Sequence, residues 1–174
     1  MTDLVKIIDD VFPSYIQDYL EESCFEENFP WSFLNDTAFP AMKGNPAFGH
    51  LGIDNFDQFS NVGIFFKIPI LMISNAFNLK HENVVRARFG LYLPLANSKL
   101  HNNPHVDMAE PHNVVLYYIN ECDGDTFFFD DNKNIIERVT PKKGRTVLFD
   151  GKTLHSSSMP SKKARITLNL NYLK

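Results

Sequence analysis

The chain has 174 residues and a mass of 20.0 kDa, a size that suits one domain able to bury about two-thirds of its unfolded surface. Its 16 phenylalanines and 44% share of hydrophobic residues indicate a well-filled core and exclude a disordered chain. No apolar run approaches the ~20 residues that a membrane-spanning helix needs, so we expect no membrane partner.

The formal net charge of −4 conceals an asymmetry between two parts of the sequence. Residues 1–36 carry nine acids and one lysine, whereas residues 138–165 carry eight lysines and arginines against Asp150 alone. The basic segment could attract an acidic substrate, or its charges could simply face solvent. A field this modest does not indicate strong nucleic-acid binding, so we expect no nucleic-acid partner.

The N-terminal residues and the two cysteines indicate in which cellular compartment the protein is expected. Asp3, Asp9 and Asp10 stand where a secretory signal would carry basic residues. Cys24 and Cys122 are 98 residues apart and form no metal-binding or redox motif. Unpaired cysteines fit a reducing environment, and we therefore expect a cytoplasmic protein.

Two helices are predicted in the first half of the chain. A strand over residues 4–11 precedes a helix that opens at Pro13 and ends near Glu22, with an apolar stripe of Tyr15, Ile16, Tyr19 and Leu20. A buried helix is predicted over residues 64–78, with an apolar stripe of Ile70, Leu71, Ile73 and Phe77. Residues 25–60 are aromatic, interrupted by glycine and proline, and give no clear assignment.

Short strands dominate the second half. They are predicted near residues 82–93, 104–109, 113–120, 125–130, 135–140, 145–149 and 164–172. Helices followed by many short strands favour a double-sheet jelly roll with supporting helices, a mainly β fold of the α+β kind. No repeat or linker divides the sequence, so we expect a single domain over 1–174, with a helical support region over 1–80 and a jelly-roll core over 82–174.

The last predicted strand alternates polar and apolar side chains over residues 165–172. One face carries Arg165, Thr167, Asn169 and Asn171, and the other carries Ile166, Leu168, Leu170 and Tyr172. The polar face could meet solvent, or it could line a polar cavity while the apolar face packs beneath helices.

The motif with the clearest chemistry is His105-Val106-Asp107, which His155 follows 48 residues later and Arg165 ten residues after that. Pro104 favours extended backbone before it, and a strand there would point residues 105 and 107 to one side. Two imidazoles and one carboxylate can hold Fe(II) and leave positions open for a co-substrate and O2. The alternative is a set of hydrogen-bonded polar residues without a metal.

Several segments in the same order resemble the Fe(II)- and 2-oxoglutarate-dependent oxygenases, on the prolyl-hydroxylase-like side of that superfamily. Beside His105-x-Asp107, His155 and Arg165-x-Thr167, the matching segments are Leu116-Tyr117-Tyr118-Ile119-Asn120, Gly124-Asp125-Thr126 and Pro141-Lys142-Lys143-Gly144-Arg145. The opening Lys6-Ile7-Ile8-Asp9-Asp10-Val11-Phe12-Pro13 also resembles the usual entry to that domain. The resemblance implies a double-stranded β-helix, the jelly roll of this superfamily.

The resemblance also implies roles for individual residues. His105, Asp107 and His155 would hold catalytic Fe(II), and Arg165 would bind the distal carboxylate of the co-substrate 2-oxoglutarate. Thr167 could add a hydroxyl donor, and Tyr118 matches a tyrosine that contacts the same carboxylate in similar hydroxylases, the alternative being a core tyrosine. O2 would be the second co-substrate, and hydroxylation of a C–H bond would release succinate and CO2.

Other residues have weaker signals. Arg86, Arg88 and Tyr92 lie on the strand before the ligand motif and could reach the mouth of the cavity, although an Arg-x-Arg strand usually faces solvent. Residues 94–103 are a candidate lid that excludes water. His112, five residues beyond Asp107, is the most probable further histidine near the site.

Two departures from the resemblance bear on the substrate. Similar prolyl hydroxylases often carry a tyrosine about ten residues before the first histidine, where this chain has Leu95. Oxygenases that repair alkylated nucleobases carry a second arginine where this chain has Asn171, so nucleobase demethylation is disfavoured. A peptidyl proline on a partner protein or peptide is the first candidate substrate, and a free amino acid or other small molecule is the second.

Two other classes of protein remain alternatives. A non-catalytic jelly roll could bind metal or a small ligand as a sensor, without turnover of 2-oxoglutarate. A purely structural jelly roll, such as a virion component, would take up no stoichiometric Fe(II). Fold-level analogy alone does not separate these alternatives from an enzyme.

Overall fold

The alternation predicted for residues 165–172 is realised in strand β11 (Arg165–Leu173), which lies in the middle of the larger of two sheets. The computed structural model describes residues 4–34, 47–58, 60, 64–96 and 99–174. Within these ranges the larger sheet has the strand order β1-β9-β6-β11-β5-β3-β2, with β4 beside β3, and the smaller has the order β10-β7-β8. All of the strand pairs are antiparallel. The other strands are β1 (Val5–Ile8), β2 (Ser32–Leu34), β3 (Ala47–Asp54), β4 (Asp57–Gln58), β5 (Val84–Tyr92), β6 (His112–Tyr118), β7 (Thr126–Phe129), β8 (Ile135–Val139), β9 (Thr146–Asp150) and β10 (Leu154–Ser157).

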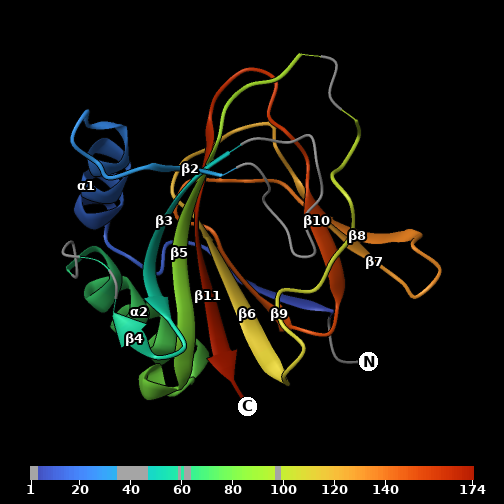
Figure 1. Ribbon diagram of the computed structural model, residues 1–174, viewed down its shortest axis with the longest axis horizontal. Helices are drawn as coiled ribbons and strands as arrows, with labels where there is room; N and C mark the ends of the chain where they lie inside the picture. Colours follow the sequence, from blue (N-terminus) through green and yellow to red (C-terminus); the bar gives the residue numbers. More distant parts are fainter. Residues whose placement is uncertain (1–3, 35–46, 59, 61–63, 97–98) are drawn as a thin grey trace.

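Two helices cover the outer face of the larger sheet. Helix α1 (Ser14–Phe25) and helix α2 (Ile64–Phe77), followed by a short 3-10 turn at His81–Asn83, lie on the side of β3, β5 and β11 that faces away from the smaller sheet (Figure 1). Neither of them, nor any other helix in the described part of the chain, is long and apolar enough to cross a membrane.

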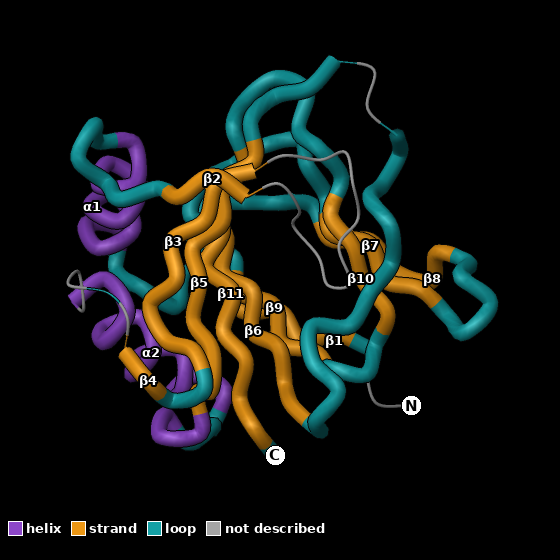
Figure 2. The backbone as a smooth tube through the Cα atoms, viewed as in Figure 1, coloured by secondary structure: helices purple, strands orange, loops and turns teal. Residues whose placement is uncertain are grey.

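The apolar face of β11 packs beneath these helices. Ile166, Leu168 and Leu170 are fully buried and belong to one core cluster with Ile70 and Ile73 of α2. Each such aliphatic side chain contributes about 1.5–3 kcal/mol through its burial. Arg165, Thr167 and Asn169 of the polar face instead line a pocket together with residues of β7 and β10, which belong to the smaller sheet (Figure 2). The second of the two predicted arrangements, a polar cavity, is therefore the one found.

A second, smaller core cluster fills part of the space between the sheets. Tyr118 of β6, Phe128 of β7 and Phe149 of β9 are its largest members, and Phe128 and Phe149 meet edge to face with their ring centroids 4.9 Å apart. The alternation of β6 sends Val114, Leu116 and Tyr118 into this cluster and Val115 and Tyr117 toward the helices. This cluster closes one end of the polar cavity.

Several local predictions were wrong. Residues 104–109 form no strand: a single pairing of residue 105 with residue 155 replaces it. Leu71 is 51% exposed, and Tyr15 and Tyr19 of α1 are 70% and 55% exposed, so these three do not belong to buried stripes. The buried face of α1 instead contains Gln17, whose side-chain amide donates to the Phe12 carbonyl oxygen (2.8 Å).

Strands β2, β3 and β4 were not predicted, whereas β1 lies within the strand predicted over residues 4–11. β3 pairs with β5 and so extends the larger sheet, and β1 pairs with β9 at the opposite edge. The region assigned to helical support thus also contributes strands to the sheet. Part of residues 25–60, including 35–46, lies outside the described residues, as do residues 97–98 of the candidate lid.

The acidic N-terminal part and the basic segment neutralise each other in the fold. Asp9 accepts two hydrogen bonds from the Arg145 guanidinium, at 2.8 and 3.0 Å, and pairs with Lys142 at 3.2 Å. Lys143 pairs with Asp18 at 2.6 Å and with Glu21 of α1 at 2.5 Å. Much of the charge asymmetry therefore serves the fold, because these ion pairs attach the end of β1 and helix α1 to the turn before β9.

The Asp9–Arg145 pair generates a pH-dependent prediction. The Arg145 hydrogen bonds, against the opposing effect of burial and with help from Lys142, lower the pKa of Asp9 to about 2. A carboxyl with a lowered pKa stabilises the fold above its ordinary pKa of about 4, and this stabilisation is lost as the pH falls toward 2. We expect Asp9→Asn to lower the free energy of unfolding by about 1–2 kcal/mol at pH 7.

Urea unfolding between pH 7 and pH 3 measures this effect. The difference between the original protein and Asp9→Asn should shrink below pH 4, while the exposed-site variant Asp131→Asn should show little difference at any pH. A difference that stays constant down to pH 3 would contradict the assigned role of the pair.

Candidate metal site and the adjoining pocket

A direct backbone pairing brings the two histidines of the motif together. The His105 amide donates to the His155 carbonyl oxygen and the His155 amide donates to the His105 carbonyl oxygen, both at 3.0 Å. His155 lies on β10, whereas His105 lies in the irregular segment that β10 holds in place. The imidazole rings lie 4.8 Å apart, centroid to centroid.

Hydrogen bonds orient each imidazole. The Nδ1 of His105 lies 3.2 Å from the Asn103 carbonyl oxygen, and the Nδ1 of His155 lies 3.0 Å from the Thr153 carbonyl oxygen. Because a carbonyl oxygen only accepts, each Nδ1 carries the proton, and each Nε2 is left as the potential metal ligand. Both Nε2 atoms face Asp107 Oδ1, at 3.7 Å from His105 and 3.6 Å from His155.

The second oxygen of Asp107 is held by β11. Asn169 and Asn171 donate side-chain hydrogen bonds to Asp107 Oδ2, at 3.1 and 2.9 Å. These bonds turn Oδ1 toward the two histidines, and one ligand atom of each of the three residues lies within 4.8 Å of the others. Asn171, which stands where a nucleobase-repair enzyme would have an arginine, instead orients the carboxylate.

The electrostatics of the triad follow from burial and mutual contact. Burial opposes ionisation of Asp107, but the hydrogen bond and charge of His155, with Asn171, hold the pKa of Asp107 well below its usual range. Burial lowers the pKa of His105, and the charge of His155 lowers it further. Burial opposes ionisation of His155, but its contact with the Asp107 carboxylate raises its pKa, so a metal competes with a proton for this imidazole.

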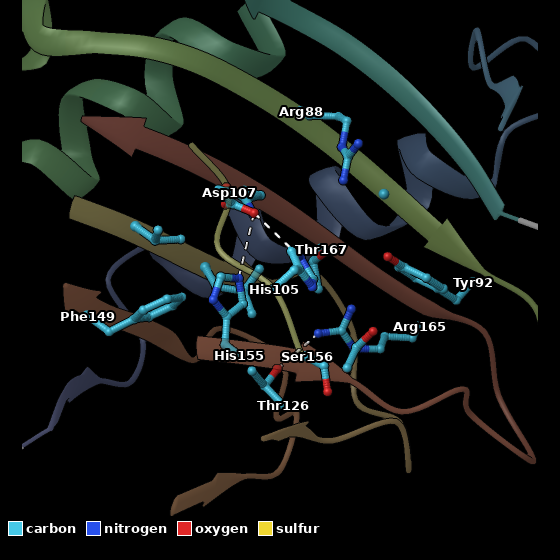
Figure 3. A pocket seen from close by; sticks show the side chains of 15 residues that line it. Arg88, Tyr92, His105, Asp107, Thr126, Phe149, His155, Ser156, Arg165 and Thr167 are labelled. Carbon is cyan, nitrogen blue, oxygen red and sulfur yellow. Dashed lines mark hydrogen bonds and ion pairs between the residues drawn. The ribbon is translucent and has the colours of Figure 1, made fainter. Parts of the chain in front are cut away.

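Arg165 lies in the same pocket, beside the triad and on the side of Tyr92 (Figure 3). It is only 3% exposed, and its Nε donates to the Gly124 carbonyl oxygen at 2.8 Å while Nη2 donates to Thr126 Oγ1 at 3.1 Å. In the described part of the chain no carboxylate pairs with Arg165. The guanidinium is thus positioned on one side and open to a ligand on the other.

The position of the Arg165 side chain requires a glycine at residue 124. A Cβ at residue 124 would lie 2.9 Å from Arg165 Cδ and 3.2 Å from the Ser158 carbonyl oxygen. The Gly124-Asp125-Thr126 segment therefore provides space, through Gly124, and a hydroxyl partner, through Thr126. The sequence marked this segment by resemblance but gave no role to Thr126.

Two further residues, Thr167 and Tyr118, were predicted to bind the co-substrate, and only one of them lines the pocket. Thr167 lines the pocket, but Tyr118 does not: its hydroxyl donates to Thr126 Oγ1 at 2.7 Å, and its ring lies under the Arg165 guanidinium. Burial raises the pKa of Tyr118, against the opposing charge of Arg165. Leu95 and His112 lie outside the pocket lining.

Two buried polar atoms of the pocket lack hydrogen-bond partners. They are Ser156 Oγ and Asn169 Oδ1, and no partner is present for either among the described residues. Arg88 and Tyr92 of β5 also line the pocket, together with apolar walls from Val114, Leu116 and Phe149. Unpaired buried polar atoms cost free energy, which favours a pocket that takes a polar ligand.

Comparisons with known proteins bear on the fold. No protein-family model matches the sequence, and none of the curated proteins matches it significantly. Among solved structures, a prolyl-4-hydroxylase of Pseudomonas putida is similar with a TM-score of 0.67 and 16% sequence identity, over 99% of this chain and 94% of that one.

Two further solved structures share the fold. A prolyl hydroxylase of Trichoplax adhaerens, in complex with a peptide fragment of the hypoxia inducible factor oxygen degradation domain, has a TM-score of 0.71 and 16% identity over 99% of this chain and 84% of that one. The epimerase SnoN from nogalamycin biosynthesis, in complex with Fe3+, alpha ketoglutarate and nogalamycin RO, has a TM-score of 0.67 and 12% identity over 99% of this chain and 79% of that one. The chain thus has the jelly-roll fold of the Fe(II)- and 2-oxoglutarate-dependent oxygenases, and the predicted fold class is confirmed.

The triad generates a metal-binding prediction. We expect one Fe(II) or Co(II) ion per chain, and a loss of affinity greater than about a hundredfold in His155→Ala, because a ligand contributes more than the partners that orient it. His101→Ala is the matched control, since His101 packs against Phe127 and Phe129 and is not part of the triad. Equal metal affinity in the two variants, measured by anaerobic titration, would rule out the triad as the site.

Asn171 provides a second prediction. Asn171→Ala removes a hydrogen bond that orients Asp107, and we expect metal affinity to fall by about 10–100-fold while the fold is retained. Thermal unfolding of the metal-free variant checks the fold, and the same titration measures the affinity. An unchanged affinity would show that Asn169 alone is sufficient to orient Asp107.

Proposed function

We propose that this protein is an Fe(II)- and 2-oxoglutarate-dependent oxygenase that hydroxylates a C–H bond of its substrate and releases succinate and CO2. The observation that carries the proposal is that the His105, Asp107 and His155 triad and the unpaired face of Arg165 line one pocket. The oxygenase fold supports it.

The residues fit the two groups that this activity requires. Two imidazoles and one carboxylate are a donor set that binds Fe(II) and leaves other coordination positions open. The buried Arg165 fork suits a carboxylate, and Ser156 Oγ and Asn169 Oδ1 are polar atoms in need of partners. When bound, Fe(II) with 2-oxoglutarate supplies the oxidation of the substrate C–H bond by O2.

The chain itself supplies position and a dry environment. Arg165 would bind the distal carboxylate of 2-oxoglutarate, and Thr167 offers a hydroxyl from the next inward position of β11. In this proposal Tyr118 does not contact the co-substrate; its hydroxyl holds Thr126 and its ring packs against Arg165. The apolar walls from Val114, Leu116 and Phe149 exclude water from the reacting atoms.

Two classes of substrate are candidates. Peptidyl proline follows the resemblance to prolyl hydroxylases, one of which was solved with a peptide fragment. A free amino acid or other small molecule is favoured by Arg88, a cation that enters the pocket, and by Leu95, which does not line it. The two cysteines, both free and buried, agree with a reducing, cytoplasmic environment, in which Fe(II) would also stay reduced.

Conversion of 2-oxoglutarate tests the proposal without knowledge of the substrate. Aerobic protein with Fe(II) and ascorbate should release succinate slowly, and Arg165→Ala should raise the Michaelis constant for 2-oxoglutarate by about 10–100-fold through the loss of charged hydrogen bonds. Lys163→Ala, an exposed cation two residues earlier, is the control and should match the original protein.

Other outcomes would favour the alternatives. Metal binding without any succinate release, with ligand affinity unchanged in Arg165→Ala, would favour a non-catalytic sensor. No stoichiometric Fe(II) uptake would leave a structural jelly roll.

A further inference from the structure

A second groove opens beside the pocket that holds the triad. It has a volume of about 850 Å³, and both Arg88 and Asp107 line it as well as the first pocket, so that the two spaces adjoin. Arg86 and Phe56 are among the other side chains in its wall. Its volume lies within the range of small-molecule sites, about 300–1,000 Å³.

Two arginines of β5 line the groove, and one of them, Arg88, also lines the pocket that holds the triad. Arg86 and Arg88 are two residues apart on β5, so they project from the same face about 7 Å from each other. In the sheet register they stand beside Asn171 and Asn169, the two side chains that hold Asp107. Figure 3 shows the Arg88 side chain pointing from β5 into the pocket.

Neither of these arginines forms a hydrogen bond or a close ion pair in the described part of the chain, although the charges of Asp107 and Asp54 act on Arg86. The other three arginines, Arg138, Arg145 and Arg165, all donate hydrogen bonds to protein oxygens. Arg86 and Arg88 are half-buried without hydrogen bond or ion pair to any described residue, even though Asp54 is the register partner of Arg86. Two unpaired like charges that are partly removed from water destabilise the fold, which points to a role in binding an anion.

A strained aromatic residue lies on the wall of the same groove. Asn55 and Phe56 form the turn between β3 and β4 with φ of 48° and 67°. Positive φ at both central positions suits Asn-Gly, whereas a bulky residue such as Phe is rare there. Phe56 is nevertheless kept in this conformation with 57% of its surface exposed, and it lines the groove. Strain that supports an exposed apolar side chain indicates a contact surface for a ligand.

We propose that the groove binds a small substrate through a carboxylate that Arg86 and Arg88 hold together, with the apolar part of the substrate against Phe56. The position of this carboxylate next to the site of oxidation rests on the proposed oxygenase function. Two guanidinium groups match the oxygens of a carboxylate and confer specificity for it over a neutral group of the same shape.

The charges of the groove favour a small monoanion over an acidic peptide. Asp54 and Glu110 line the same groove and would repel a partner that carries several carboxylates. With Fe(II) and dianionic 2-oxoglutarate in place, the charges of the metal, Asp107, 2-oxoglutarate and Arg165 cancel one another. The positive charges of Arg86 and Arg88 would then attract the substrate, and Asp54 and Glu110 would limit its charge.

Titration calorimetry with hexanoate and its neutral analogue hexanamide tests the proposal, with 2-oxoglutarate and Fe(II) present under anaerobic conditions. Hexanoate should bind at least about tenfold more tightly than hexanamide, and the double variant Arg86→Gln/Arg88→Gln should lose this preference. Lys80→Gln removes an exposed cation outside the groove and is the control. The lysine double variant Arg86→Lys/Arg88→Lys keeps both charges but loses the planar forks, so it should bind hexanoate more weakly than the original protein and still prefer it to hexanamide. If Arg86→Gln/Arg88→Gln does not fold, the single variant Arg88→Gln and the lysine double variant replace it.

Three results would overturn the proposal: no binding of hexanoate, equal binding of hexanamide, or undiminished hexanoate binding in Arg86→Gln/Arg88→Gln. The succinate assay, run beside this titration, separates the proposal from the oxygenase assignment. Hexanoate binding in a protein that never converts 2-oxoglutarate would support the arginine site and contradict the oxygenase activity. Succinate release by a protein that fails to bind hexanoate would support the oxygenase activity and contradict the arginine site.

Discussion

The backbone pairing of His105 with His155 is the constraint on which the rest of the site depends. Its two hydrogen bonds, both 3.0 Å long, attach an irregular segment to β10 and set two imidazoles against one carboxylate. Carbonyl oxygens then fix the ring orientations, and two asparagines of β11 fix Asp107. The three candidate ligands are thus oriented by the protein itself, which lowers the entropic cost of binding a metal.

Strand β11 joins the stability of the fold to its chemistry. Its apolar residues form the core beneath the helices, and its polar residues orient Asp107 and present Arg165 to the pocket. Because alternation along a strand has a period of two, a slip of one residue in its register would exchange the two faces and destroy both. β5 continues the polar surface with Arg86 and Arg88, so that co-substrate and substrate sites would share one sheet face.

The sequence predicted those features that depend on strict periodicity or on a motif. Alternation located β11, and the spacing of His105, Asp107 and His155 located the triad. The strand predicted at 104–109 failed because a pairing with residue 155 holds the segment without a continuous ladder. β3 was missed because its partner β5 is distant in sequence. The resemblance assigned Tyr118 to the co-substrate carboxylate, and its hydrogen bond to Thr126 could not be predicted because it is a property of the packed fold.

An anaerobic titration of the metal-free protein with Fe(II) and 2-oxoglutarate tests the central claim most directly, since their chelate has a weak visible charge-transfer band. The account predicts a band that saturates at one metal per chain and that disappears when a triad histidine is replaced. Fe(II) binding without a band in the presence of saturating 2-oxoglutarate would contradict the oxygenase assignment. A chain that binds no Fe(II) would contradict the metal site itself.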